Sequence, residues 1–179
     1  MNTELAQLER AVQKVTNPSK FEDLMNECKV EKTPSDSLWW ATPKLLEFAD
    51  KIGYNVKYDD PVKVLPLREQ VEFNSETSTM HGICVPWHKE IVIAPDDAKD
   101  FQVRTLVHEL THALGARTSS EGNDEITSET TAWLVCKQLG YDVWDFTLPY
   151  TAFHYWTEKG KFLTDDITKY TNRILGAFS

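Results

Sequence analysis

Two histidines and a glutamate lie close together in the segment TLVHELTHALG, residues 105–115. His108 and His112 are four residues apart, so on a helix both imidazoles project from the same side, with Cβ atoms about 5–6 Å apart. Imidazole nitrogens at that separation can share one tetrahedral Zn²⁺, each at about 2.0–2.1 Å. Glu109 lies about 100° further round the helix, where it can reach a metal-bound water without binding the metal. This is the HExxH pattern of zinc metallopeptidases.

The pattern is specific for a chain of this composition. A random shuffle of the 179 residues contains on average only about 0.01 HExxH matches. The alternative interpretation is a helix with two surface histidines and a salt-bridging glutamate. An apolar stripe on another face of the helix favours the metal site, because the stripe can face the core while the three polar residues face a cleft. The stripe consists of Val103, Leu106, Val107, Leu110 and Leu114.

A catalytic zinc site needs a third protein ligand and an open position for water. Glu125 and Glu129 are four residues apart on a helix expected over residues 124–139, so both can face the first helix. We predict that Glu129 is the third ligand, because packed apolar residues follow it. Glu125 is expected to support a ligand or to be the alternative ligand, and a solvated helix face remains the other interpretation. Glu121 in the expected loop suits the role less well, and Cys136 is more typical of a core residue.

Several other polar side chains are candidates for supporting roles. His154, Tyr150 and Tyr155 lie on a late helix, and one of them could stabilise the oxyanion of a hydrolysis reaction by donating a hydrogen bond. The alternative is that they simply pack. Arg104 could orient a carboxylate in the site, but we expect it to form a surface salt bridge.

The elements that must position these residues follow from periodicity and turn signals. Strands followed by packed helices predict an α+β fold. We expect an N-terminal helical region over residues 1–55 and the catalytic domain over 56–179. Helices are expected over 5–15, 19–28, 42–52, 103–114, 124–139, 151–159 and 165–178, with Thr42 and Thr164 as caps and Gly53, Gly115 and Gly140 as stops. Strands are expected over 54–58, 62–66 and 71–73, and a hairpin over 82–94.

Composition limits the classes of function. The chain has 19 Lys and Arg against 28 Asp and Glu, a net charge of −9. Tight sequence-independent binding to nucleic acid depends on basic residues that neutralise phosphates, so the bulk charge does not support it. Three widely spaced cysteines argue against a disulfide framework and favour a reducing compartment. The first residues contain no apolar run and no stretch approaches the ~20 apolar residues of a membrane span, so we expect a cytoplasmic protein without a membrane partner.

The segments RTLVHELTHALGA and NDEITSETTAWLVCKQLG together resemble the zincin-like metallopeptidase domain of plasmid and phage antirestriction proteins, the alleviation-of-restriction-of-DNA type C group. The matching positions are His108, Glu109, His112, Glu125 and Glu129. HKEIVIAP before the first helix and YTAFHYW near the end are similar to further parts of that domain, so the resemblance covers roughly residues 82–178. It implies a zincin-like fold, in which a small twisted sheet packs on the active-site helix, and a role in antirestriction or mobile-element defence.

The sequence therefore predicts a peptidase with one Zn²⁺ per chain held by His108, His112 and Glu129. Glu109 would take a proton from the attacking water and later deliver it to the leaving amine. The substrate would be a protein or peptide, which could add in extended form along the strand EIVIA, residues 90–94. Two alternatives stay open: a non-catalytic zinc-containing binding or inhibitor protein, and an antirestriction protein that binds single-stranded DNA through residues 1–80.

Overall fold

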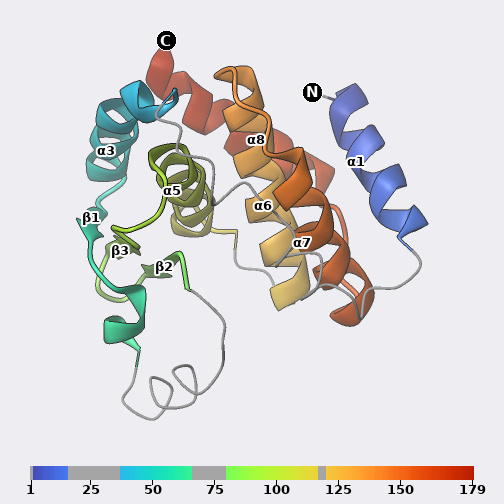
Figure 1. Ribbon diagram of the computed structural model, residues 1–179, viewed down its shortest axis with the longest axis horizontal. Coiled ribbons are helices and arrows are strands. Elements are labelled where there is room, and N and C mark those ends of the chain that lie inside the picture. Colours follow the sequence, from blue (N-terminus) through green and yellow to red (C-terminus); the bar gives the residue numbers. More distant parts are fainter. Residues whose placement is uncertain (1, 16–36, 66–79, 117–119) are drawn as a thin grey trace.

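The computed structural model describes residues 2–15, 37–65, 80–116 and 120–179. This part of the chain is a mixed α+β structure, mostly helical, with one small sheet (Figure 1). In chain order the elements are α1 (Asn2–Lys14), the 3-10 helix η3 (Trp39–Ala41), α3 (Thr42–Lys51), β1 (Asn55–Tyr58), the 3-10 helix η4 (Pro61–Val64), β2 (Gly82–Val85), β3 (Glu90–Ile93), α5 (Lys99–Ala113), α6 (Glu121–Gln138), α7 (Trp144–Thr157), α8 (Thr164–Leu175) and the 3-10 helix η5 (Gly176–Phe178).

The sheet has three strands in the order β1-β3-β2. β2 and β3 form the expected antiparallel hairpin, and β1 pairs in parallel with the other side of β3. The expectation that residues 90–94 offer a free edge is therefore wrong, because β3 is paired on both sides. β2 is an outer strand: in the part of the chain that the structure describes, no strand pairs with its other edge.

The hairpin register decides which backbone groups of β2 point outward. The Ala94 N–H donates to the His81 carbonyl at 2.8 Å, so these two opposite residues form a hydrogen-bonded pair. Along an antiparallel pair of strands, hydrogen-bonded and non-hydrogen-bonded pairs alternate. Gly82 and Cys84 therefore occupy non-hydrogen-bonded positions, opposite Ile93 and Ile91. Their N–H and C=O groups point away from β3, toward the outer edge.

Helix α5 occupies the centre of the molecule. It packs against β2 and β3 on one side and against α6 on the other, and α6 also contacts α7 and α8 (Figure 1). The predicted apolar stripe is confirmed as core, with Val103, Leu106, Val107 and Leu110 at most 1% exposed. At the start of the helix the Asp100 carboxylate accepts hydrogen bonds from the Ser37 hydroxyl and the Leu38 N–H, which fix the preceding segment onto α5.

One hydrophobic cluster contains residues from both of the regions that we expected as domains. Leu5, Leu8 and Val12 of α1 belong to the same cluster as Ile91 of the sheet and Trp133 of α6. The boundary between residues 55 and 56 stays a prediction. None of the described helices combines the length and the apolar character needed to cross a bilayer.

The predicted elements agree with the structure except at boundaries and in one segment. Residues 62–65 do not form a strand: Pro61 begins a 3-10 turn, which the Asp60 side chain caps by accepting from the Val62 N–H. Helix α7 begins at Trp144, seven residues earlier than expected, and includes Pro149. Thr42 and Thr164 are the first helical residues rather than the caps. The elements expected over 19–28 and 71–73 lie outside the described residues.

Candidate metal centre

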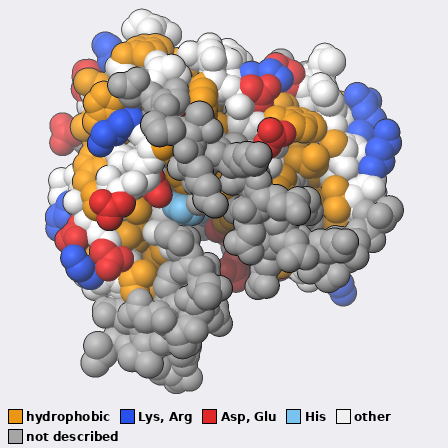
Figure 2. All heavy atoms as spheres, in the orientation of Figure 1, with side chains coloured by type: hydrophobic (Ala, Val, Ile, Leu, Met, Phe, Trp, Pro, Cys, Tyr) orange, Lys and Arg blue, Asp and Glu red, His pale blue; other side chains and the backbone are white. Residues whose placement is uncertain are grey.

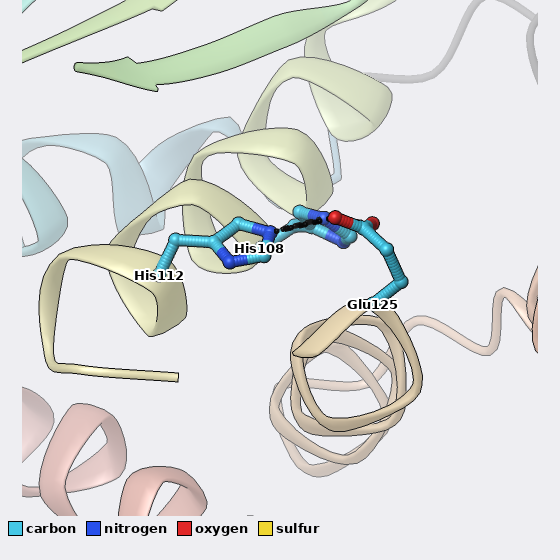
Figure 3. A group of neighbouring side chains, drawn as sticks. All are labelled: His108, His112 and Glu125. Atoms are coloured by element: carbon cyan, nitrogen blue, oxygen red, sulfur yellow. Dashed lines mark hydrogen bonds and ion pairs between the residues drawn. The ribbon is translucent and has the colours of Figure 1, made fainter. Parts of the chain in front are cut away.

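The two motif histidines and Glu125 face one another between α5 and α6 (Figure 3). The Nε2 atoms of His108 and His112 are 3.1 Å apart. The Glu125 carboxylate bridges them, with Oε2 at 3.3 Å from Nε2 of His108 and Oε1 at 3.3 Å from Nε2 of His112. Three residues from two helices thus bring potential ligand atoms together.

These separations fit a tetrahedral cation. Ligands at about 2.0–2.1 Å from a tetrahedral ion lie about 3.3–3.4 Å from one another. The separation of 3.1 Å between the two nitrogens, and those of 3.3 Å from each nitrogen to a different oxygen of Glu125, are close to that spacing. Two imidazoles and a carboxylate, with a fourth position left open, are also the donor set of catalytic zinc sites.

The other ring nitrogens of the two histidines face acceptors. Nδ1 of His108 lies 3.3 Å from Oε2 of Glu129, and Nδ1 of His112 lies 3.2 Å from the Ala116 carbonyl oxygen. When both rings are neutral and each Nδ1–H donates a hydrogen bond to that acceptor, both Nε2 atoms carry a bare lone pair. Two lone pairs and a carboxylate then meet without a proton between them, an arrangement that a cation stabilises.

The electrostatics of the cluster also favour a positive charge. Burial lowers the pKa of His112, but the hydrogen bond and charge of Glu125 outweigh it and raise that pKa to about 9. Burial dominates at His108 and lowers its pKa to about 4. Burial acts to raise the pKa of Glu125, but hydrogen bonds with both histidines hold it well below the usual value. Glu125 is therefore ionised and attracts a proton or a metal.

Glu129, which we expected as the third ligand, lies elsewhere. Its Oε2 approaches the opposite nitrogen of His108, its Oε1 accepts from the Thr147 hydroxyl at 2.6 Å, and it forms an ion pair with Arg104. Because α6 runs antiparallel to α5, four residues along α6 carry Glu129 about 6 Å toward Arg104. The structure brings Glu125, the alternative ligand, to the two Nε2 atoms.

Glu109 lies against the outer edge of β2. Its carboxylate is buried and accepts a hydrogen bond from the Cys84 N–H. A Cβ atom at Gly82 would lie 3.2 Å from Oε1 of Glu109 and 2.6 Å from Cγ2 of Thr105, so the glycine lets α5 approach the strand this closely. Burial raises the pKa of Glu109 to about 7. A carboxyl group with this pKa can take up and release a proton near neutral pH.

The three candidates for oxyanion stabilisation occupy different places. The Tyr150 hydroxyl donates to Oε2 of Glu125 at 2.7 Å, and burial raises its pKa well above the usual value, so it remains a neutral donor. The His154 ring packs 4.7 Å from the Tyr150 ring, with Nδ1 at 2.8 Å from Glu158. Tyr155 instead packs against Trp156 and among core residues. An oxyanion role for any of them stays a prediction.

The remaining candidates do not join the cluster. Glu121 is exposed at the start of α6. Cys136 is a buried core residue, and burial raises the pKa of its thiol to about 12. On the face drawn in Figure 2, a histidine side chain (pale blue) is visible near the centre of the molecule beside an acidic one (red).

Sequence reasoning missed or misplaced three residues that shape the site. Arg104 is 4% exposed and pairs with the buried Glu129. The expectation that it forms a surface salt bridge is therefore wrong. Thr147 and Gly82 were not identified, because a single threonine or glycine carries no motif. The spacing of Arg104, four residues before His108, was the one available signal, since it places both on the same helix face.

Comparison with models of protein families, with curated proteins and with solved structures gives no match. The resemblance to antirestriction metallopeptidases therefore stays a prediction that rests on the motif residues.

Proposed function

We propose that this protein is a zinc-dependent metallopeptidase whose cation is held by His108, His112 and Glu125. The observation that carries the proposal is the convergence of these three side chains beside a buried Glu109 whose pKa is raised to about 7. A purely structural zinc site has no use for an acid in that position. When bound, the cation supplies Lewis acidity and lowers the pKa of a water molecule to about 7.

Glu109 is the general base and acid of the proposed reaction. It follows His108 directly on α5, so it lies beside the metal cluster while its side chain reaches β2. It accepts the proton of the attacking water and donates a proton to the leaving amine. General acid–base catalysis of this kind contributes about 10²–10⁴-fold to the rate.

We propose that the substrate is a protein segment in extended form that pairs with the outer edge of β2. The outward N–H and C=O groups of Gly82 are oriented for such pairing, and Glu109, which accepts a hydrogen bond from the outward Cys84 N–H, lies at the same edge. Addition of a strand to a sheet edge is a common mode of peptide recognition. This assignment replaces the inner strand β3. A role in antirestriction or mobile-element defence remains part of the proposal and rests on the sequence resemblance.

The test is hydrolysis of a mixed peptide library by the purified protein, loaded with one equivalent of Zn²⁺. We expect cleavage by the wild type, loss of at least about 10²-fold in Glu109→Gln, and unchanged zinc content in that variant. Glu121→Gln, at an exposed acid of α6, is the matched control and should cleave like the wild type. Zinc binding without hydrolysis by the wild type would favour the non-catalytic alternative.

A further inference from the structure

Arg104 is a buried cation next to the metal cluster. It lies on α5 one turn before His108, and its side chain is 5% exposed. Its partner Glu129 is fully buried. Removing charges from water costs several kcal/mol per ion, so a buried pair is stable only where further contacts compensate both partners.

Aromatic rings hold the guanidinium group in place. Its central carbon lies 4.1 Å from the ring centroid of Phe146 on α7 and 5.2 Å from that of Phe101 on α5. Ring faces attract cations at these distances. The two rings also contact each other, with centroids 5.2 Å apart. The position of Arg104 is therefore fixed by side chains from two helices.

Both oxygens of Glu129 are in turn committed to specific partners. Oε2 is shared between the Arg104 guanidinium and Nδ1 of His108, and Oε1 accepts from the Thr147 hydroxyl. A carboxylate that accepts a hydrogen bond from the Nδ1–H of a metal-binding histidine fixes the tautomer and the ring orientation of that histidine. The neutral histidine then presents Nε2 as a bare ligand.

We propose that Arg104 is a positioning residue that fixes Glu129 on Nδ1 of His108 and leaves Glu125 as the acid facing the cation. This inference rests on the proposed function. Glu125 and Glu129 are one turn apart on the same helix, so nothing on α6 alone distinguishes their roles. Arg104 distinguishes them, because its guanidinium group pairs with Glu129 and holds that carboxylate on the Nδ1 side of His108, away from the Nε2 atoms.

The test is a double variant that removes the pair without leaving an unpaired charge, Arg104→Met with Glu129→Met. We expect it to fold, because apolar side chains of similar volume often replace a buried ion pair at no cost in stability. Its dissociation constant for Zn²⁺, measured by chelator competition, should rise about 10–100-fold. Nitrogen NMR of the metal-free protein should show His108 protonated at Nδ1 in the wild type and as a mixture of tautomers in the variant. A merely structural pair would change neither readout.

The matched control removes another ion pair. Lys57→Met with Glu90→Met breaks the pair that joins β1 and β3 and should leave zinc affinity unchanged. If the double variant at Arg104 and Glu129 does not fold, Thr147→Val gives the answer, since it removes the donor to Oε1 and keeps both charges. It should raise the dissociation constant for Zn²⁺ above that of the wild type, by less than about 10–100-fold, and an unchanged value would contradict the positioning role.

The outcomes separate this inference from the proposed function. If the wild type binds zinc and the double variant binds it equally well, Arg104 has no positioning role, while the proposed metal centre stands. If the wild type binds no zinc, the metal centre itself is overturned, and the inference with it.

Discussion

The Nε2 atoms of His108 and His112 lie 3.1 Å apart, and the carboxylate of Glu125 faces both of them. Each of these imidazoles has an acceptor on its other nitrogen. The helix spacing of the two histidines and the antiparallel return of α6 thus bring three potential metal ligands together. The following predictions depend on this geometry.

The two glutamates of α6 should behave differently when each is replaced by glutamine. Glu125→Gln removes a proposed ligand and should weaken zinc binding by more than the ~10–100-fold that loss of a supporting residue costs. Glu129→Gln leaves Arg104 as an unpaired buried charge and should lower the free energy of unfolding of the metal-free protein by about 3–5 kcal/mol. Chelator competition and urea denaturation measure the two effects. A larger rise of the dissociation constant for zinc in Glu129→Gln than in Glu125→Gln would indicate that Glu129, and not Glu125, is the ligand.

Zinc affinity should rise with pH. In the metal-free protein Glu125 raises the pKa of His112 to about 9 against the effect of burial, so His112 carries a proton at neutral pH. Metal must displace that proton, so binding releases one proton and the dissociation constant should fall about tenfold per pH unit between about pH 7 and 8.5. Above the pKa of His112 the dependence should level off. Calorimetry in buffers of different ionisation enthalpy counts the released protons, and a count of zero at pH 7 would contradict the assignment.

Gly82→Ala should reduce hydrolysis more than it reduces zinc affinity. The added methyl group would lie 2.6 Å from Cγ2 of Thr105 and 3.2 Å from Oε1 of Glu109, so it must displace the base or the helix from β2. Overpacking of this kind costs about 1–3 kcal/mol of stability. Gly176→Ala is the matched control, because a Cβ atom there meets nothing within 4 Å. Equal activity of the two variants would show that the close approach at β2 is unimportant.

Tyr150→Phe should weaken zinc binding about tenfold while the fold remains intact. The substitution removes the hydroxyl that donates to Glu125 at 2.7 Å and keeps the ring that stacks on Phe146. Tyr155→Phe is the control, since this ring packs among core residues. A large fall in the catalytic constant of Tyr150→Phe at saturating zinc would indicate the additional oxyanion role. The same zinc affinity in both variants would argue that the hydrogen bond to Glu125 has no effect on the metal.

The hydrolysis rate should increase as Glu109 loses its proton. Burial raises the pKa of this carboxyl group to about 7 in the metal-free protein, and a bound cation would lower it. The acid limb of the rate profile should therefore lie between the ordinary value of 4.5 and about 7. In Glu109→Gln, any residual rate should lack this limb. An unchanged limb in that variant would assign the titration to another group.

Local patterns predicted the parts of the fold that depend on short-range spacing. The apolar stripe of α5, the hairpin of β2 and β3, and the helix ends at Gly115 and Gly140 follow from periodicity and from residues with positive φ. The start of α7 was predicted too late, because Pro149 is atypical of a helix interior yet lies inside this one.

The features that sequence reasoning misplaced depend on long-range packing. Glu125 and Glu129 have the same local pattern, and only the register of α6 against α5 decides which of them meets the histidines. The central place of β3 depends on β1, which pairs with it from more than 30 residues away in the sequence. The burial of Arg104 depends on α7, which supplies the Phe146 ring and the hydroxyl that binds Glu129.

X-ray absorption spectroscopy of the zinc-loaded protein tests the metal centre most directly. We predict one zinc per chain with two imidazole nitrogens and carboxylate and water oxygens at about 2.0–2.2 Å, and loss of this signature in His112→Ala and Glu125→Ala. A spectrum with sulfur ligands, or the same spectrum in those two variants as in the wild type, would contradict it.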